Sequence, residues 1–437
     1  MGGGLMQLVA YGAQDIYLTG NPQITFFKVV YRRHTNFSME SIQQTWNGNS
    51  NSANGRCTAT ISRNGDLVHK LYFQIDTGNR ATGSASFASS NPGAAWIDTV
   101  SVEIGGQTID KQYGSWLETW AELTEVNPTG VIAGVNENAS TVAAAALSSQ
   151  DYQNTLFQRM AGMGGVCNNA SNSLEKLNSG RYFYVPLQFW FCRNPGLALP
   201  LIALQYHEVK IIVEHKFGAI FPSTGGPDQQ LWADYIYLDT DERRRFAQVS
   251  HEYLIEQLQM QDASTSSKTV DLNFNHPVKE LIWTGKWDDT SAVGAGATGQ
   301  SRGTNAPLAI FDSNAVSADT FLLKLNGHDR FAPRPVTYFT QAQVHQYHSG
   351  PGGLNTQLYT VTGESSGSFV NNFDDSIAVY SFALKPEEHQ PSGTCNFSRI
   401  DSAQLIRSDN VQAMRIYAVN YNVLRIMSGM GGLAYSN

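Results

Sequence analysis

Short apolar strands joined by glycine-containing turns recur along the chain, and this pattern constrains its fold more than any other feature. From Trp96, the sequence WIDTVSVEIGGQTID predicts two alternating strands with Gly105-Gly106 as the hairpin turn. From Ile61, ISRNGDLVHKLYFQI predicts a second hairpin with Asn64-Gly65 as its turn. An aromatic content of 11% and the presence of 39 glycines also favour short strands over long helices. We therefore expect an all-β protein.

Landmarks in the first half of the chain recur in the second half. Leu71 in DLVHKLYF matches Leu281 in HPVKELIW, and the GGQ turn near Gly106 matches the NGH turn near Gly327. A third match aligns LQYHEVKI with VNYNVLRI, which places Tyr206 opposite Tyr421. The spacing of about 210 residues is nearly constant, which suggests a duplicated domain. Chance similarity between apolar strands is the alternative, because strand patterns resemble one another.

The duplication predicts two eight-stranded sandwiches side by side, and glycine and proline mark the break between them. GAIFPSTGGPDQQ, from Gly218, is rich in both. We place an N-terminal arm at residues 1–25, the first sandwich at 26–216 and the second at 217–437. The long loops rich in Gly, Ser, Ala, Asn and Thr are expected to point outward.

Two further segments have a clear periodicity. From Tyr182, YFYVPLQFWF is a continuous apolar run and predicts a strand buried on both faces. Behind the acidic residues 239–242, apolar residues recur at helical spacing and predict one helix. They are Phe246, Val249, Tyr253, Leu254 and Leu258.

The charge of the chain excludes a protein that coats nucleic acid. Its 437 residues carry a net charge of −8, whereas phosphate binding normally requires a basic face or arm. The one dense basic cluster, Arg243 to Arg245, follows acidic residues that neutralise it at a helix start. Only 15% of residues are charged, which is typical of surfaces that copies of the same protein cover. No apolar run reaches the roughly 20 residues of a membrane span, so we expect a soluble protein.

One glycine motif resembles a nucleotide-binding fingerprint. Gly294, Gly296 and Gly299 form GxGxxG, and Asp319 follows at the expected distance. No strand–turn–helix context surrounds it, so we interpret the segment as a flexible surface loop.

Histidines form the one candidate metal motif. His345 and His348 form HxxH, and His328 lies upstream. Zinc normally requires three or four protein ligands, and no further ligand is near in sequence, so we expect solvated loop histidines. No P-loop or HExxH is present. The sequence therefore predicts a protein that is not an enzyme, without a cofactor and without a metal.

Several long motifs resemble one family. They occur in the family's order and span nearly the whole chain: GNPQITFFKVVYRRHTNF from Gly20, LPLIALQYHEVKI from Leu199, LDTDERRRFA from Leu238, CNFSRID from Cys395 and NYNVLRIMSGMGGLAYSN from Asn420. On these residues the chain resembles the major capsid proteins of large icosahedral nucleocytoplasmic DNA viruses, of the algal, chlorella-virus type. The resemblance implies a double jelly roll, two tandem eight-stranded antiparallel jelly rolls with short helices and long loops.

The resemblance also implies partners and a location. Proteins of this family form homotrimers, which give pseudo-hexagonal capsomers that contact one another and tile an icosahedral shell. The arm is then expected to face minor capsid proteins above an inner membrane, without insertion into it and without direct contact with nucleic acid. The protein would be made in the host cytoplasm and located in the outer capsid of the virion.

The resemblance also predicts covalent glycans, and a second class of function stays open. Capsid proteins of this type are glycosylated at outward loops, which makes Asn305 and Asn355 the candidate sites for covalent glycans. The alternative function is a jelly-roll carbohydrate-binding or adhesin module with convergent aromatic and amide side chains. A glycoside hydrolase would require two convergent carboxylates.

Overall fold

The structure is a computed structural model that describes residues 6, 12–29, 31–77, 92–125, 132–133, 152–153, 156–163, 182–221, 227–263, 267–285, 320–350, 352, 377–408 and 413–435. The chain divides into two units, Met1–Phe37 and Ser38–Asn437. The first unit extends beyond the expected arm and contains the short helix α2 (Ile16–Thr19), which ends at Gly20. Phe26 and Phe27 lie in the same unit and are 87% and 98% exposed.

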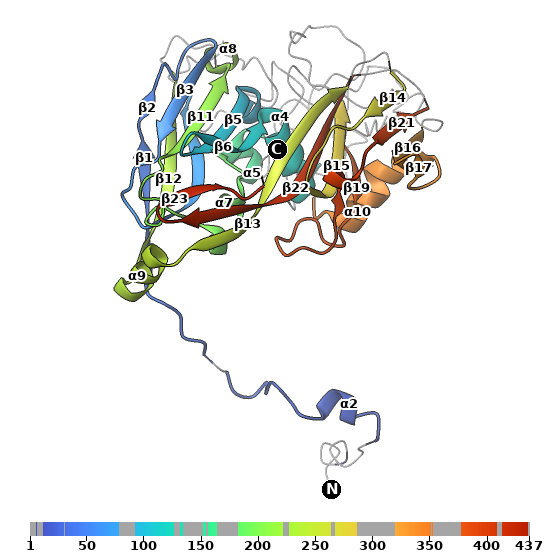
Figure 1. Cartoon of the computed structure of the whole chain (residues 1–437), viewed down its shortest axis with the longest axis horizontal. Coiled ribbons are helices and arrows are strands. Elements are labelled where there is room, and N and C mark those ends of the chain that lie inside the picture. The colour runs from blue at the N-terminus through green and yellow to red at the C-terminus, as the bar shows by residue number, and fades with distance from the viewer. Residues whose placement is uncertain are drawn as a thin grey trace, which may run out of the picture. The chain divides into compact units, whose positions relative to one another are not determined.

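The second unit begins with a sandwich of two sheets (Figure 1). One sheet has the order β1 (Phe37–Gln44), β12 (Asp228–Leu238), β4 (Leu67–Asp76) and β10 (Leu199–Pro200), with β9 (Tyr182–Pro186) also paired to β4. The other has the order β2 (Trp46–Asn47), β3 (Gly55–Thr60), β11 (Val209–His215), β5 (Ile97–Ile104) and β6 (Gln107–Tyr113). We call these ten strands the first sandwich.

A second sandwich follows with the same plan. One sheet has the order β13 (His251–Ala263), β22 (Met414–Met427), β15 (Pro277–Gly285) and β19 (Ile377–Ser381), with β20 (Cys395–Asn396) paired to β15 and β23 (Met430–Leu433) paired to β22. The other has the order β14 (Thr269–Asp271), β21 (Ala403–Arg407), β16 (Thr320–Leu325) and β17 (His328–Asp329), with β18 (Arg334–Pro335) paired to β16. The expected all-β fold is confirmed.

Within the described residues, short helices and one further strand pair connect these sheets. The pair is β7 (Ile132–Ala133) with β8 (Tyr152–Gln153). The helices are α3 (Pro92–Ala95), α4 (Gly114–Thr124), α5 (Leu156–Ala161), α7 (Trp190–Arg193), η1 (Pro195–Leu197), α8 (Phe217–Ile220), α9 (Thr240–Gln248), η2 (Tyr338–Ala342), α10 (Gln343–Tyr347) and η3 (Phe397–Arg399).

Aromatic rings fill the space between the two sheets of each sandwich. In the first, the ring of Phe73 on β4 packs edge to face on Trp96, with centroids 4.9 Å apart. In the second, Trp283 on β15 packs on Phe321 of the opposite sheet at 5.3 Å. These four side chains are at most 1% exposed. Large buried rings of this kind dominate the hydrophobic stabilisation of a core.

The sheet orders confirm two of the three repeat landmarks. Leu71 on β4 and Leu281 on β15 lie on corresponding inner strands, and both are 1% exposed. The hairpins β5–β6 and β16–β17 also correspond, and their turns contain Gly106 and Gly327 with φ of 87° and 78°. Glycine is suited to both turns because it has no Cβ to oppose a positive φ.

The third landmark was wrong. Tyr206 precedes β11, whereas Tyr421 lies within β22. The strand that corresponds to β11 is β21, the neighbour of β16, because β11 is the neighbour of β5. Apolar strands of similar composition allowed the sequences to be aligned one strand out of place.

Three local predictions also differ from the structure. Residues 61–66 are not a hairpin turn, because β3 and β4 belong to opposite sheets and this segment connects them. β9 alternates between exposed and buried residues instead of being buried on both faces. The predicted helix ends at Gln248 as α9, while Tyr253, Leu254 and Leu258 lie on β13.

The position of β12 bears on the boundary between the halves. The division at residue 217 would assign β12 to the second sandwich, but β12 pairs with β4 over most of its length. The backbone therefore passes to the second sandwich after Leu238, through α9. We propose a boundary near residue 239 in place of residue 217.

Candidate functional site: the junction between the two sandwiches

A single hydrophobic cluster extends from the first sandwich into the second. It contains Trp116, Trp120 and Trp190 from the helices of the first sandwich, together with Ile282 and Tyr417 from the second. The rings of Trp116 and Tyr417 lie 5.1 Å apart. Alternate residues of β22, Ile416 and Ala418, instead face the separate core of the second sandwich. The sheet of the second sandwich that contains β22 is therefore buried on both faces.

Hydrogen bonds at the start of α4 attach the helix to β22. The side-chain hydroxyl of Tyr417 donates to the hydroxyl oxygen of Ser115 at 2.7 Å, and Arg415 donates to the same oxygen at 2.9 Å. Arg415 also pairs with Asp262 at 2.8 Å. Because Tyr417 is fully buried, this pairing satisfies a hydroxyl that water does not reach.

The other end of α4 is capped by a loop of the second sandwich. The last carbonyl groups of a helix lack partners within it. Gly350 N donates to Leu123 O at 2.7 Å, and Gly352 N donates to Glu122 O at 2.9 Å. The Ser349 hydroxyl donates to Thr124 O at 2.9 Å. The second sandwich thus supplies the C-terminal cap of a helix that belongs to the first.

His348 begins this capping loop and lies between two carboxylates. Its Nε2 is 3.1 Å from Glu280, and its Nδ1 is 3.1 Å from Glu387. Burial alone would lower the pKa of His348, but the two carboxylates raise it to about 9. His348 is therefore a buried cation near the C-terminal end of α4, where the helix dipole favours positive charge.

A second group of charges crosses the junction. Arg193 on α7 pairs with Glu256 on β13 at 2.8 Å, and Lys279 pairs with the other oxygen of Glu256 at 2.9 Å. Burial would raise the pKa of Glu256, but these two cations lower it to about 2. The Arg193 guanidinium also lies 4.8 Å from the centre of the Trp120 ring. Arg193 thus combines an ion pair and a cation–π contact.

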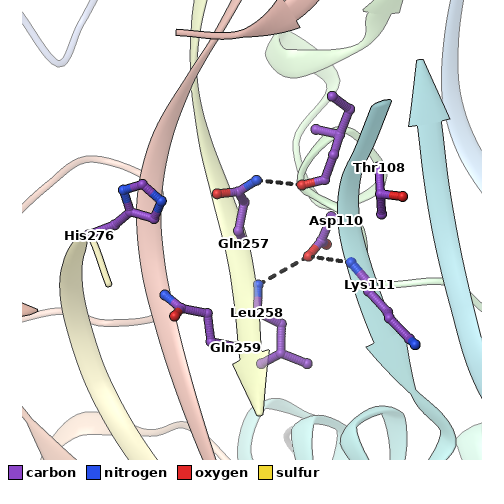
Figure 2. A pocket seen from close by; sticks show the side chains of 8 residues that line it. Thr108, Asp110, Lys111, Gln257, Leu258, Gln259 and His276 are labelled. Carbon is purple, nitrogen blue, oxygen red and sulfur yellow. Dashed lines mark hydrogen bonds between the residues drawn. The ribbon is translucent and has the colours of Figure 1, made fainter. Parts of the chain in front are cut away.

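Side chains also join the edge strands β6 and β13, as Figure 2 shows. Asp110 accepts hydrogen bonds from Leu258 N and Lys111 N at 3.0 Å each, and Gln257 donates to Ile109 O. Burial raises the pKa of Asp110 to about 6, partly offset by these donors and by Arg193. These bonds occupy backbone groups that an edge strand would otherwise offer to another chain.

A pocket of about 240 Å³ lies between these two strands (Figure 2). Besides the residues that bridge the strands, it is lined by Thr108, Gln259 and His276. Gln259 is already paired with Asn275 and Asn420. Much of the polar lining is therefore already engaged in hydrogen bonds, either between the two sandwiches or within the second one.

The C-terminal hairpin adds a third contact between them. Tyr206 N of the first sandwich donates to the backbone oxygen of Gly429, in the turn between β22 and β23, at 3.0 Å. Leu433 N donates to the side-chain oxygen of Gln107 at 3.3 Å. A Cβ on Gly431 would lie 2.6 Å from Leu204, so glycine permits this close approach.

The structure separates the histidines of the HxxH motif. His348 is buried, so the expectation of a solvated histidine was wrong for this residue. His345 and His328 are exposed. Within the described ranges, no group of three or more His, Cys, Asp and Glu could hold a metal ion. The glycine motif at 294–299, Asp319 and the glycan candidates Asn305 and Asn355 lie outside the described residues.

Sequence reasoning missed the charged residues of the junction. Lys279 and Glu280 are adjacent within the apolar strand PVKELIWTG, and both are 0% exposed. Charged residues are seldom fully buried unless they are paired. Two charges inside an apolar strand were therefore a usable signal of a second packed layer.

No helix in the described part of the chain is long and apolar enough to span a membrane.

Comparisons with known proteins agree with this architecture. A chain of the PBCV-1 virus capsid is 35% identical, with a TM-score of 0.68, over 94% of this chain and 100% of that one. Two paired sandwiches joined in this way define a double jelly-roll capsid protein.

The sequence comparisons identify the family. The family described as the major capsid protein N-terminus matches residues 25–239, and that of the large eukaryotic DNA virus major capsid protein matches 242–367 and 369–432. The major capsid protein of Pyramimonas orientalis virus is 50% identical, and that of Paramecium bursaria Chlorella virus 1 is 39% identical, each over 100% of both chains. The chain belongs to the major capsid proteins of large eukaryotic DNA viruses.

Proposed function

We propose that this chain is a shell subunit that forms homotrimers, and that each trimer is a pseudo-hexagonal capsomer of an icosahedral capsid. Three copies with two sandwiches each contribute six similar blocks. Such a trimer packs hexagonally although its true symmetry is three-fold, and the two blocks of each chain are free to differ at their contacts.

The observation that carries the proposal is the rigid junction between the sandwiches. A hexagonal outline requires a constant angle between the two blocks of a chain. The shared core, the cap on α4 and the Arg193–Glu256 pair all oppose rotation of one sandwich against the other. Packed interiors resist continuous deformation, so this junction favours one angle.

Further parts of the function rest on the family. We propose that capsomers contact one another and minor capsid proteins, with the first unit as the contacting arm, and that they assemble in the host cytoplasm above an inner membrane. The role is structural and needs no catalysis, cofactor or direct contact with nucleic acid. Asn305 and Asn355 are the proposed sites of covalent glycans. The intact mass of the chain taken from virions is therefore expected to exceed the mass of its polypeptide.

Negative-stain electron microscopy of the purified protein tests the capsomer directly. Uniform three-fold particles with a hexagonal outline are expected. Isolated two-lobed monomers at micromolar concentration, together with binding on a glycan array, would favour the carbohydrate-binding or adhesin module instead.

A further inference from the structure

One buried carboxylate links the edge strands of the two sandwiches. β6 ends a sheet of the first sandwich and β13 ends a sheet of the second, and no strand pairing joins them in the described part of the chain. Oδ1 of Asp110 on β6 instead accepts the backbone N–H of Leu258 on β13 and that of Lys111 on its own strand, each at 3.0 Å. The contact between these two strands therefore depends on one acceptor, together with the bond from Gln257 to Ile109 O.

The charges around Asp110 do not include a cation of its own. Asp110 is 4% exposed, and no ion pair between described residues includes it. Arg193 on α7 attracts the carboxylate from a longer distance, because its guanidinium is paired with Glu256. The Lys111 ammonium lies 5.7 Å from the centre of the Tyr113 ring, and Figure 2 shows this side chain running away from Asp110. A buried carboxylate without a paired cation is costly as an anion.

The second oxygen of Asp110 has a neighbour that suits both protonation states. Oδ2 accepts from Gln112 Nε2 at 3.0 Å, and the same nitrogen donates to Gln188 O at 2.9 Å. Among the described residues, none donates to the buried Oε1 of Gln112. Once Oδ2 carries a proton it becomes a donor, and rotation of the Gln112 amide offers it Oε1 as an acceptor. Gln188 O then keeps a donor in Arg193 Nε, at 3.0 Å.

The pocket of about 240 Å³ between β6 and β13 gives protons a route to this carboxylate (Figure 2). Asp110 lines the pocket together with Thr108 and Lys111, both of which are exposed to solvent. His276, which precedes β15, also lines it and is half-buried. Asp110 can therefore exchange a proton with water while the two sandwiches stay in contact.

We propose that Asp110 is a pH-sensitive link between the two sandwiches, which takes up a proton in mildly acidic solution and then holds β6 against β13 more firmly than its anion does. The link lies within one chain, so it does not depend on the trimer proposed above. A shell built from this chain would hold its two blocks together more firmly in mild acid than at neutral pH.

The direction of the effect follows from the two opposing influences on the carboxylate. Burial raises the pKa of Asp110 to about 6, although the three hydrogen-bond donors and the charge of Arg193 oppose this. When β6 and β13 separate, water reaches the carboxylate, and its pKa returns toward the ordinary value of about 3.9. The stabilisation of the contact is therefore fully present below that value and is lost as the pH rises through about 6.

Hydrogen exchange of the Leu258 amide tests the link in the full-length protein, because this N–H is released when β6 and β13 separate. Mass spectrometry with electron-transfer fragmentation resolves the amide. Its protection factor, the intrinsic exchange rate divided by the measured one, removes the direct effect of pH on exchange. The protection factor should be roughly tenfold higher at pH 5 than at pH 7.5, the ratio that follows from a pKa of about 6 in the closed contact and about 3.9 in the open one.

Two variants identify the group that binds the proton. Asp110→Asn cannot titrate and should have the same protection factor at both pH values. His276→Asn removes the histidine of the pocket and should keep the tenfold change, and asparagine tolerates the φ of 65° at this position. A wild-type protection factor that is equal at pH 5 and pH 7.5 would overturn the link without any variant. A tenfold change that persists in Asp110→Asn, or that disappears in His276→Asn, would overturn it as well.

Discussion

The guanidinium of Arg193 and the carboxylate of Glu256, from different sandwiches, form an ion pair of 2.8 Å in which Glu256 is 5% exposed. Lys279, with a fully buried side chain, holds the other oxygen of the same carboxylate. The junction therefore combines apolar packing with paired charges that water does not screen. Removal of one partner leaves the remaining charges unbalanced inside the protein.

Arg193→Ala is expected to lower the free energy of unfolding by about 3 kcal/mol, because it breaks a largely buried ion pair. Arg425→Ala is the matched control, since Arg425 and Glu252 form a pair of 2.7 Å whose side chains are 51% and 59% exposed. That change should cost at most about 1 kcal/mol. Urea unfolding followed by tryptophan fluorescence measures both, and equal losses would contradict the buried role of Arg193.

Stability should decrease at alkaline pH because of His348. Its pKa is raised to about 9 in the folded protein. The ordinary pKa of histidine is about 6.5, so this stabilisation is fully present below that pH. It is lost as the pH rises through the folded value, because the folded state then releases a proton that the unfolded state has already lost.

The His348→Gln variant isolates this contribution from lysines, tyrosines and cysteines that titrate in the same range. The difference in unfolding free energy between the wild type and His348→Gln should shrink between pH 7 and pH 10. The control is His328→Gln, which replaces an exposed histidine. The difference in unfolding free energy between the wild type and this variant should stay constant over the same pH range. A His348→Gln difference that is constant over this interval would argue against a buried imidazolium.

Gly350→Ala is expected to displace the loop that caps α4. A Cβ at this position would lie 2.5 Å from Glu122 O and 2.6 Å from the Leu123 carbonyl carbon. The loss of two or three capping hydrogen bonds should cost about 2–3 kcal/mol, at roughly 1 kcal/mol each. In Gly196→Ala, a Cβ would meet only the Asn194 side chain at 3.3 Å, so little change is expected. Thermal unfolding of both variants makes the comparison, and identical midpoints would show that the cap contributes nothing.

Phe26→Asp is expected to abolish trimers without unfolding the subunit. Phe26 is 87% exposed within the first unit, and an exposed aromatic residue in an arm is suited to burial against another chain. Thr25→Asp adds the same charge without removing the ring and should retain trimers. Native mass spectrometry of the two variants provides the measurement. An unchanged trimer mass for Phe26→Asp would exclude the arm from the subunit contact.

Local sequence patterns predicted the features that depend on neighbouring residues. The Gly105-Gly106 turn and its two alternating strands follow from backbone conformation and burial on one face. The same reasoning failed at Asn64-Gly65, because two adjacent strands can join opposite sheets as readily as one hairpin. The helix prediction at Tyr253 failed for a similar reason, since β13 is packed on both sides and loses the alternation that marks a strand.

The sequence by itself determined the strand-rich composition, the duplication and the family, because these depend on residue types in order along the chain. Only the tertiary structure decided which strands pair, where the halves divide and which charges are buried. His348 appeared to be a loop histidine, yet Glu280 and Glu387, distant in sequence, enclose it at 3.1 Å. These contacts form within the second sandwich between segments that are far apart in the sequence, and no pattern of residues around His348 encodes them.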